Sequence, residues 1–207
     1  MSHVTARAQR SAHAARAEQH DRRGALVRAA YARIADKGFE GLRTRDVAAD
    51  VGLNVATLHY YFPTKESLIR AVVGHAMSKF GAALPREGSA AQQLAGHFRA
   101  IRRLLRDEPE LWAVLGELAL RAPRDPEMAA IMRPTDQAWH ARVRDMLAKG
   151  VEEGGIDAAI EPADAAAAIV GAIRGASLPG LADVRAERLD QTFRQLERWF
   201  GLPSTAP

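Results

Sequence analysis

Apolar residues recur at helical spacing along most of the chain, and no segment sustains the apolar–polar alternation of a strand. Leu26, Ala30 and Ile34 begin this pattern, and Gly38 follows where a helix is expected to end. We therefore predict an all-α protein whose first helix starts near Arg22. Residues 1–19 contain almost no large apolar side chain, so we predict a disordered basic arm there.

Two short helices are predicted on either side of Gly52. Asn54 is placed to cap the second of them, and Pro63 ends it because proline lacks an N–H and disfavours helical geometry in the preceding residue. Ala48 and Gly52 are small enough to let two helices cross at the wide angle of a helix-turn-helix. The pattern therefore predicts a helix-turn-helix over about residues 43–62. An ordinary corner between two helices is the alternative that these spacings leave open.

The rest of the chain has the pattern of longer amphipathic helices. The predicted helices cover residues 90–107, 109–122 and 125–151, followed by about 161–178 and about 184–201. These elements suggest two parts: an N-terminal three-helix domain over residues 20–80, and a larger helical domain over residues 81–207.

Charge is distributed unevenly between these two parts. Residues 1–80 contain 13 Lys or Arg and 7 Asp or Glu, whereas residues 81–207 contain 16 and 18. A basic small domain joined to a near-neutral larger one indicates that the first binds a polyanion such as DNA. Charge alone leaves a merely solvated surface as the alternative.

Membrane and secreted classes are disfavoured by the apolar pattern. The nearest candidate for a bilayer span, residues 163–181, is Ala-rich and contains Asp164, Arg174 and Pro179. The N-terminus lacks the apolar core of a secretory signal, and the chain has no cysteine for disulfides. We therefore expect a cytoplasmic protein.

Motifs for catalysis are missing from the sequence. It contains no Gly-rich phosphate loop, no H-E-x-x-H and no G-x-S-x-G, and its seven histidines show no ligand-like spacing. We therefore predict that the protein is not an enzyme and uses no metal or cofactor.

Three motifs occur in order inside residues 20–80, separated from one another by only three or four residues. They are "KGF" at the end of the first helix, then "TRDVAADVGL", then "TLHYYFPTKESL". In this order they resemble the N-terminal domain of the tetracycline-repressor (TetR) family of bacterial transcription regulators. The resemblance implies a homodimer that binds a palindromic operator in double-stranded DNA and is released by a small, largely apolar effector. A transcriptional activator and a non-specific DNA-binding protein are the alternatives.

The resemblance also implies which side chains contact DNA. Phosphate contacts are expected from Thr44, Arg45 and Lys65, and the groove is expected to be lined by Asn54, Val55, Ala56, Thr57, His59, Tyr60 and Tyr61. A lysine at the start of a helix favours an anion on physical grounds as well, because the helix N-terminus carries partial positive charge. Val55 and Ala56 offer methyl contacts to thymine where many relatives carry other side chains.

In the larger domain the resemblance implies an effector pocket within residues 90–152. The candidate lining residues are His97, Phe98, Trp112, Leu115, Met132, Trp139 and His140. A stripe of Met and Trp at helical spacing is also typical of a plain core.

The last two helices are expected to pair with those of a second copy, again by resemblance. Two stripes are candidates for this interface: Ala167, Gly171 and Gly175 on one helix, and Leu189, Phe193, Leu196 and Phe200 on the other. Both stripes equally suit burial within one chain.

Overall fold

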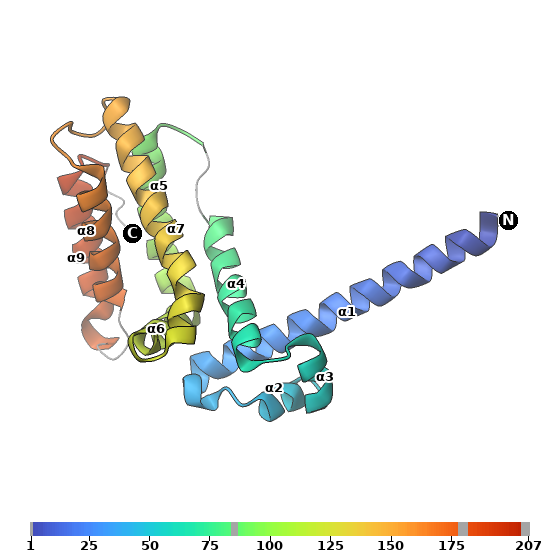
Figure 1. The fold of residues 1–207 in the computed structure, drawn as a ribbon. Helices are drawn as coiled ribbons and strands as arrows, with labels where there is room; N and C mark the ends of the chain where they lie inside the picture. The colour runs from blue at the N-terminus through green and yellow to red at the C-terminus, as the bar shows by residue number, and fades with distance from the viewer. Residues whose placement is uncertain (1, 84–86, 178–181, 204–207) are drawn as a thin grey trace. The chain divides into compact units, whose positions relative to one another are not determined.

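The computed structural model describes residues 2–83, 87–177 and 182–203. Within these ranges every regular element is helical, which confirms the all-α fold (Figure 1). The chain divides into two compact units, residues 1–75 and residues 76–207. The boundary falls inside helix α4 (Lys65–Ala83), the same helix in which the predicted boundary lies.

The first unit contains α1 (Ser2–Lys37), a 3₁₀ turn (Phe39–Gly41), α2 (Thr44–Asp50), α3 (Val55–Tyr61) and the first part of α4. The structure differs from the disordered arm predicted for residues 1–19, because α1 is already helical from Ser2. Ala, Arg, Gln and Glu dominate this segment and have high intrinsic helix propensity. The lack of large apolar residues indicates that this segment does not pack into a core, but it does not exclude a helix.

The turn between α2 and α3 has the geometry that the sequence predicted. Gly52 has φ 70°, and the backbone N–H of Leu53 donates to the carbonyl of Ala48 at 2.9 Å. Asn54 caps α3 by accepting the N–H of Thr57 at 2.8 Å. These contacts fix the direction in which α3 leaves α2.

Arg33 of α1 holds α2 in place through two carboxylates. Its guanidinium donates to Asp50 with one distance of 2.8 Å, and its Nη1 lies 3.4 Å from Asp46. The hydrogen bond from Arg33 lowers the pKa of Asp50. The paired charges therefore fasten the helix-turn-helix to the long first helix.

The second unit contains the end of α4, then α5 (Ala90–Asp107), α6 (Pro109–Arg121), a 3₁₀ turn (Ala122–Arg124), α7 (Pro126–Glu152), α8 (Pro162–Ser177) and α9 (Ala182–Trp199). These bounds lie within two residues of the predicted ones. Helix α7 packs against α5, α6 and α8, and α9 packs against α5 and α8, so that α8 and α9 run side by side (Figure 1).

The apolar stripe of α9 faces the core of its own chain. The four residues Leu189, Phe193, Leu196 and Phe200 are at most 6% exposed. The ring of Phe193 lies 5.8 Å from that of Phe98 on α5. These side chains are therefore not available to a second copy, so the structure does not support their prediction as interface residues. The same stripe suits burial inside one chain equally well.

A buried charge cluster joins the same two helices. Arg102 of α5 lies 3.2 Å from Asp190 and 3.7 Å from Glu197 of α9, and Glu197 is only 1% exposed. Buried charges are costly unless they are paired, so this cluster favours one register of α9 on α5.

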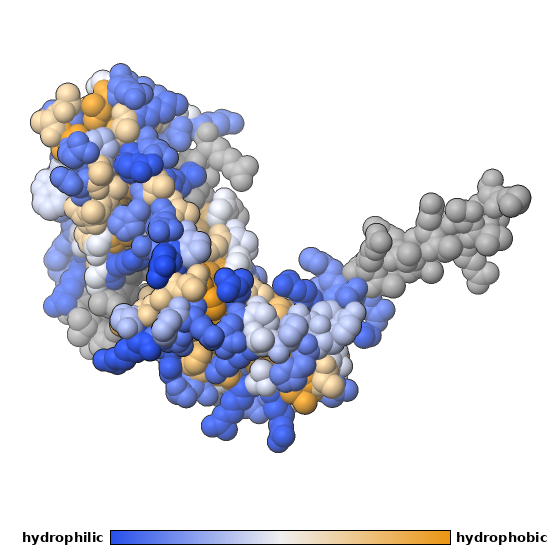
Figure 2. Space-filling model, in the orientation of Figure 1, coloured by the Kyte–Doolittle hydropathy of each residue, from blue (hydrophilic) through white to orange (hydrophobic). Residues whose placement is uncertain are grey.

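No helix in the described ranges is long and apolar enough to cross a bilayer. On the face in view, hydrophilic residues and small apolar areas are interspersed over both units (Figure 2).

Candidate nucleic-acid interface and ligand pocket

Helix α3 separates its side chains cleanly between a buried and an exposed face. Leu58 and Phe62, four residues apart, are 0% and 1% exposed and join the core of the first unit. Val55 and Tyr60, by contrast, are 37% and 72% exposed, so the core of the first unit does not cover them. The helix therefore presents an outer face that is open to solvent.

The structure places most of the predicted groove residues on this outer face. Asn54, Val55, Ala56, His59 and Tyr60 are exposed, and Thr57 and Tyr61 are half-buried. The hydroxyl of Thr57 donates to the side chain of Asn54 at 3.0 Å, so these two polar groups hold each other at the start of α3.

The two tyrosines form a pair on the outer face. Their rings meet edge to face with centroids 5.2 Å apart. The Tyr60 hydroxyl accepts a long hydrogen bond, 3.4 Å, from Gln19 of α1. The rings thus support each other, while a tyrosine hydroxyl remains a group able to reach a phosphate oxygen.

The three predicted phosphate ligands lie at helix starts. Thr44 and Arg45 begin α2, where Thr44 is half-buried and Arg45 exposed. Lys65 begins α4 and lies over the ring of Phe39, with 4.1 Å between Nζ and the ring centroid. A stacked cation is oriented before any anion arrives.

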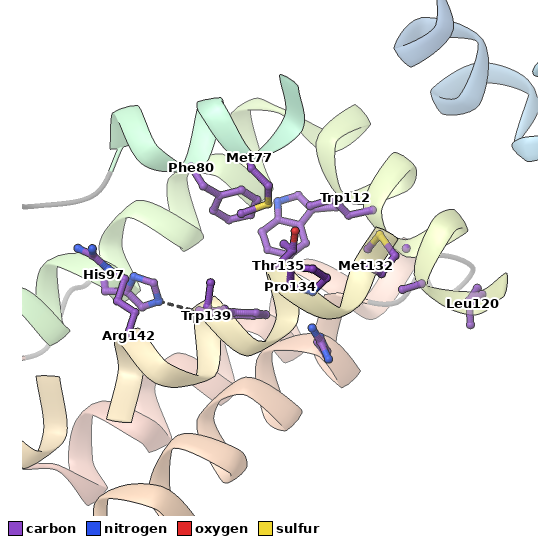
Figure 3. A pocket seen from close by; sticks show the side chains of 15 residues that line it. Met77, Phe80, His97, Trp112, Leu120, Met132, Pro134, Thr135, Trp139 and Arg142 are labelled. Atoms are coloured by element: carbon purple, nitrogen blue, oxygen red, sulfur yellow. Dashed lines mark hydrogen bonds between the residues drawn. The ribbon is translucent and has the colours of Figure 1, made fainter. Parts of the chain in front are cut away.

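The second unit contains a cavity of about 680 Å³, within the range that holds a drug-sized ligand. Five predicted residues line it: His97, Trp112, Leu115, Met132 and Trp139. Its other lining residues are Met77, Phe80, Gly116, Ala119, Leu120, Pro134, Thr135, Ala138, Arg142 and Arg174. Figure 3 shows His97 and Arg142 together at one end and Met132 and Leu120 toward the other.

At the polar end, His97 is held by a tryptophan. The indole N–H of Trp139 donates to Nε2 of His97 at 3.0 Å (Figure 3). Burial, with a smaller contribution from the charge of Arg142, lowers the pKa of His97 to about 4. The imidazole is therefore neutral at pH 7.

Two predicted lining residues are elsewhere. Phe98 is fully buried against Phe193, and His140 lies 3.7 Å from Asp136 on the surface of α7. Each directly follows a residue that does line the cavity, His97 or Trp139. Successive helix residues differ by about 100° in direction, so both side chains point away from it.

Sequence reasoning missed two arginines of the lining. Arg142 was detectable, because Met132, Thr135, Trp139 and Arg142 follow one face of α7 at spacings of three and four. Arg174 comes from α8, lies 5.5 Å from the ring of Trp139 and pairs with Asp136. No local spacing connects α8 to α7, so this contact needed the tertiary structure.

Helix α8 has an exposed face of small residues. Ala167, Gly171 and Gly175 are all exposed, and an added Cβ at either glycine meets nothing within 4 Å. Trp199 near the end of the neighbouring helix α9 is 61% exposed.

Solved structures share this fold across nearly the whole chain. A TetR transcription regulator from Haloarcula marismortui is 18% identical, with a TM-score of 0.78, covering 88% of this chain and 97% of that one. One from Chloroflexus aurantiacus is 19% identical with a TM-score of 0.76, covering 88% and 95%. A Saccharomonospora viridis protein, assigned as a transcriptional regulator and solved in complex with choline, is 20% identical with a TM-score of 0.70, covering 87% and 95%.

Sequence families match both parts of the chain, whereas no curated protein matches it. Residues 26–72 match the family of bacterial regulatory proteins named tetR, and residues 90–200 match the C-terminal domain of BetI-type transcriptional repressors. Because these two matches cover most of the 207 residues, the chain belongs to the TetR family of bacterial transcriptional regulators.

Proposed function

We propose that the protein is a repressor that binds a palindromic operator as a homodimer and leaves it when a small, largely apolar effector binds. The observation that carries this proposal is the outer face of α3. Leu58 and Phe62 anchor that helix inward, while Val55, His59 and Tyr60 are exposed on its outer face. A helix mounted in this way fits the major groove of B-DNA.

A palindromic operator requires two copies of α3 about one helical turn of DNA, or roughly 34 Å, apart. The exposed small-residue face of α8 is our candidate for the surface that joins the two copies. Ala167, Gly171 and Gly175 permit close approach of a second helix, since no side chain beyond a methyl group projects from them.

Release by an effector would use the cavity in the second unit. Met77 and Phe80, which line it, belong to α4, and the same helix carries Lys65 in its first turn. A ligand that favours one position of α4 thereby changes the fraction of molecules able to bind DNA.

The choline bound by the Saccharomonospora viridis protein suggests a cationic ligand as a second candidate. The rings of Phe80, Trp112 and Trp139 suit a quaternary ammonium in principle. Arg142 in the same lining repels it, and Arg174 already lies over Trp139. The charges of this chain therefore disfavour choline.

Selection of genomic fragments from the source organism tests the proposal. The full chain is incubated with sheared genomic DNA, and the bound fragments are sequenced. We expect one palindrome upstream of a promoter, bound at least about a thousandfold more tightly than random duplex. Similar affinity for every fragment would instead identify a non-specific DNA-binding protein. In a transcription assay on the selected fragment, higher output with added protein would identify an activator.

A further inference from the structure

The cavity in the second unit is polar at one end and apolar toward the other. His97 and Arg142 lie together at the polar end, and Met132 and Leu120 lie toward the apolar one (Figure 3). A ligand that fills this cavity is therefore itself amphipathic, with a head group at His97 and an apolar body along α6 and α7.

The hydrogen bond from Trp139 determines which nitrogen of His97 carries the proton. An indole can only donate, so Nε2 of His97, 3.0 Å away, is the acceptor. In a neutral imidazole the proton is then on Nδ1. His97 is 2% exposed, and its Nδ1 has no hydrogen-bond partner among the described residues. It is a buried donor in the cavity lining that still requires an acceptor.

The other polar side chains of the lining are also mainly donors. Nε1 of Trp112 is buried without a hydrogen-bond partner in the described part of the chain. Arg142 and Arg174 carry positive charge, and none of the lining residues identified in the described ranges is Asp or Glu. Asp136, outside the lining, pairs with Arg174 and offsets its charge. The lining thus favours a hydrogen-bond acceptor that carries negative charge.

We propose that the ligand of this cavity is an amphipathic carboxylate, whose carboxylate accepts hydrogen bonds from Nδ1–H of His97 and from the guanidinium of Arg142. Its apolar body contacts Trp112, Met132 and Leu120. This inference rests on the proposed effector role of the same cavity and specifies the chemical class that the cavity selects.

The test compares matched head groups on two apolar bodies. Decanoate and 4-phenylbutanoate are each compared with the amide and the trimethylammonium compound of the same chain, by calorimetric titration into the full-length protein. We expect each carboxylate to bind at least about tenfold more tightly than its two partners. Equal or tighter binding of the amide or the cation in both series would overturn the proposal. So would the absence of binding by all six probes to protein whose circular dichroism is helical.

Two arginine variants on α7 provide the specificity control. Arg142→Met keeps the aliphatic length of the side chain and should reduce the carboxylate preference to less than about twofold, with affinity for the amide almost unchanged. Arg133→Met changes an exposed arginine outside the lining and should keep the wild-type preference. A carboxylate preference that survives in Arg142→Met would contradict the proposed contact. The head-group comparison on the unaltered protein decides the matter even if this variant does not fold.

Failure of this inference is distinguishable from failure of the proposed function. Selection of a palindrome by a protein that ignores the carboxylates would leave the regulator in place and overturn the ligand class. Tight carboxylate binding by a protein that selects no palindrome would support the ligand class and overturn the operator-binding role.

Discussion

Trp139 of α7 donates its indole N–H to Nε2 of His97 on α5 at 3.0 Å, and this bond joins the two helices at the polar end of the cavity. The acceptor nitrogen must stay unprotonated for the bond to exist. Protonation of His97 would turn Nε2 into a donor facing a donor. The contact is therefore sensitive to acid for a reason that is visible in the geometry.

The stability of the protein should decrease as the pH is lowered, because His97 is buried in its neutral form. Its pKa is about 4 in the folded chain, below its ordinary value of 6.5. Between these values the unfolded state binds the extra proton, so folding stability falls as the pH is lowered from 6.5 to 4. The contribution lost is on the order of 3 kcal/mol. It is fully present above pH 6.5.

Urea unfolding at a series of pH values measures this loss. His97→Gln removes the titrating group, so the variant should show a flatter dependence between pH 6.5 and pH 4 than the wild type. His20→Gln, at an exposed histidine of the first unit, should keep the wild-type dependence because it leaves His97 intact. Parallel curves for wild type and His97→Gln would show that His97 is not the acid-sensitive group.

Two glycines of the first unit should respond to alanine in opposite directions. Gly52 has φ 70° with no atom within 4 Å of an added Cβ, so Gly52→Ala is penalised only by its left-handed backbone, by about 1 to 2 kcal/mol. Gly74 lies inside α4 with equally open space, so Gly74→Ala should stabilise by up to about 1 kcal/mol. Chemical unfolding measures both. A neutral or stabilising Gly52→Ala would refute the tight turn between α2 and α3.

Substitutions on the outer face of α3 should change sequence preference for DNA, whereas a substitution of Lys65 should change affinity for all DNA. Thr57→Ala and His59→Ala should lower affinity for the selected operator by about 1 to 3 kcal/mol and affect random duplex much less, if they read bases. Lys65→Ala should weaken both kinds of DNA alike and lower the salt slope by about one, since phosphate contacts carry no sequence information.

Fluorescence anisotropy over a range of salt concentrations separates these effects. Arg99→Ala, at an exposed arginine of α5, is the charge control and should leave both affinities as they are. Equal losses on operator and random DNA for Thr57→Ala and His59→Ala would rule them out as base readers. A loss confined to the operator in Lys65→Ala would contradict its role at phosphate.

The individual helices of this fold could be predicted from the sequence because they depend on residues that are neighbours in the chain. Helix α5 begins after Ser89, where a capping box with Gln92 satisfies the first N–H groups, and it spans the predicted residues 90–107. The buried and exposed faces of α3 likewise follow from the four-residue spacing of Leu58 and Phe62. A pattern within one helix fixes its ends and its faces.

Which residues cover a buried face could not be predicted from the sequence in the same way. An apolar stripe such as Leu189 and Phe193 requires burial, but one chain and two chains provide it equally well. Only the packing of α9 on α5, with Arg102 paired to Glu197, shows that the cover comes from the same chain. The place of Arg174 in the cavity lining could not be predicted for a similar reason, because its neighbour Trp139 is distant in sequence.

The exposed face of α8 leads to the last prediction, on assembly. Ala167→Glu places a charged side chain on the small-residue face, where a close helix contact would have to bury it unpaired. Ala130→Glu makes the same change at an exposed position of α7 and is the matched control. We expect light scattering to show a dimer for the wild type and the control, and a monomer for Ala167→Glu with unchanged helicity.

That monomer should lose most of its affinity for the palindrome while keeping its weak affinity for one half-site, since a single α3 reaches only one half. A dimeric Ala167→Glu would place the interface on another surface, and a monomeric wild type would require the second copy to be recruited by DNA.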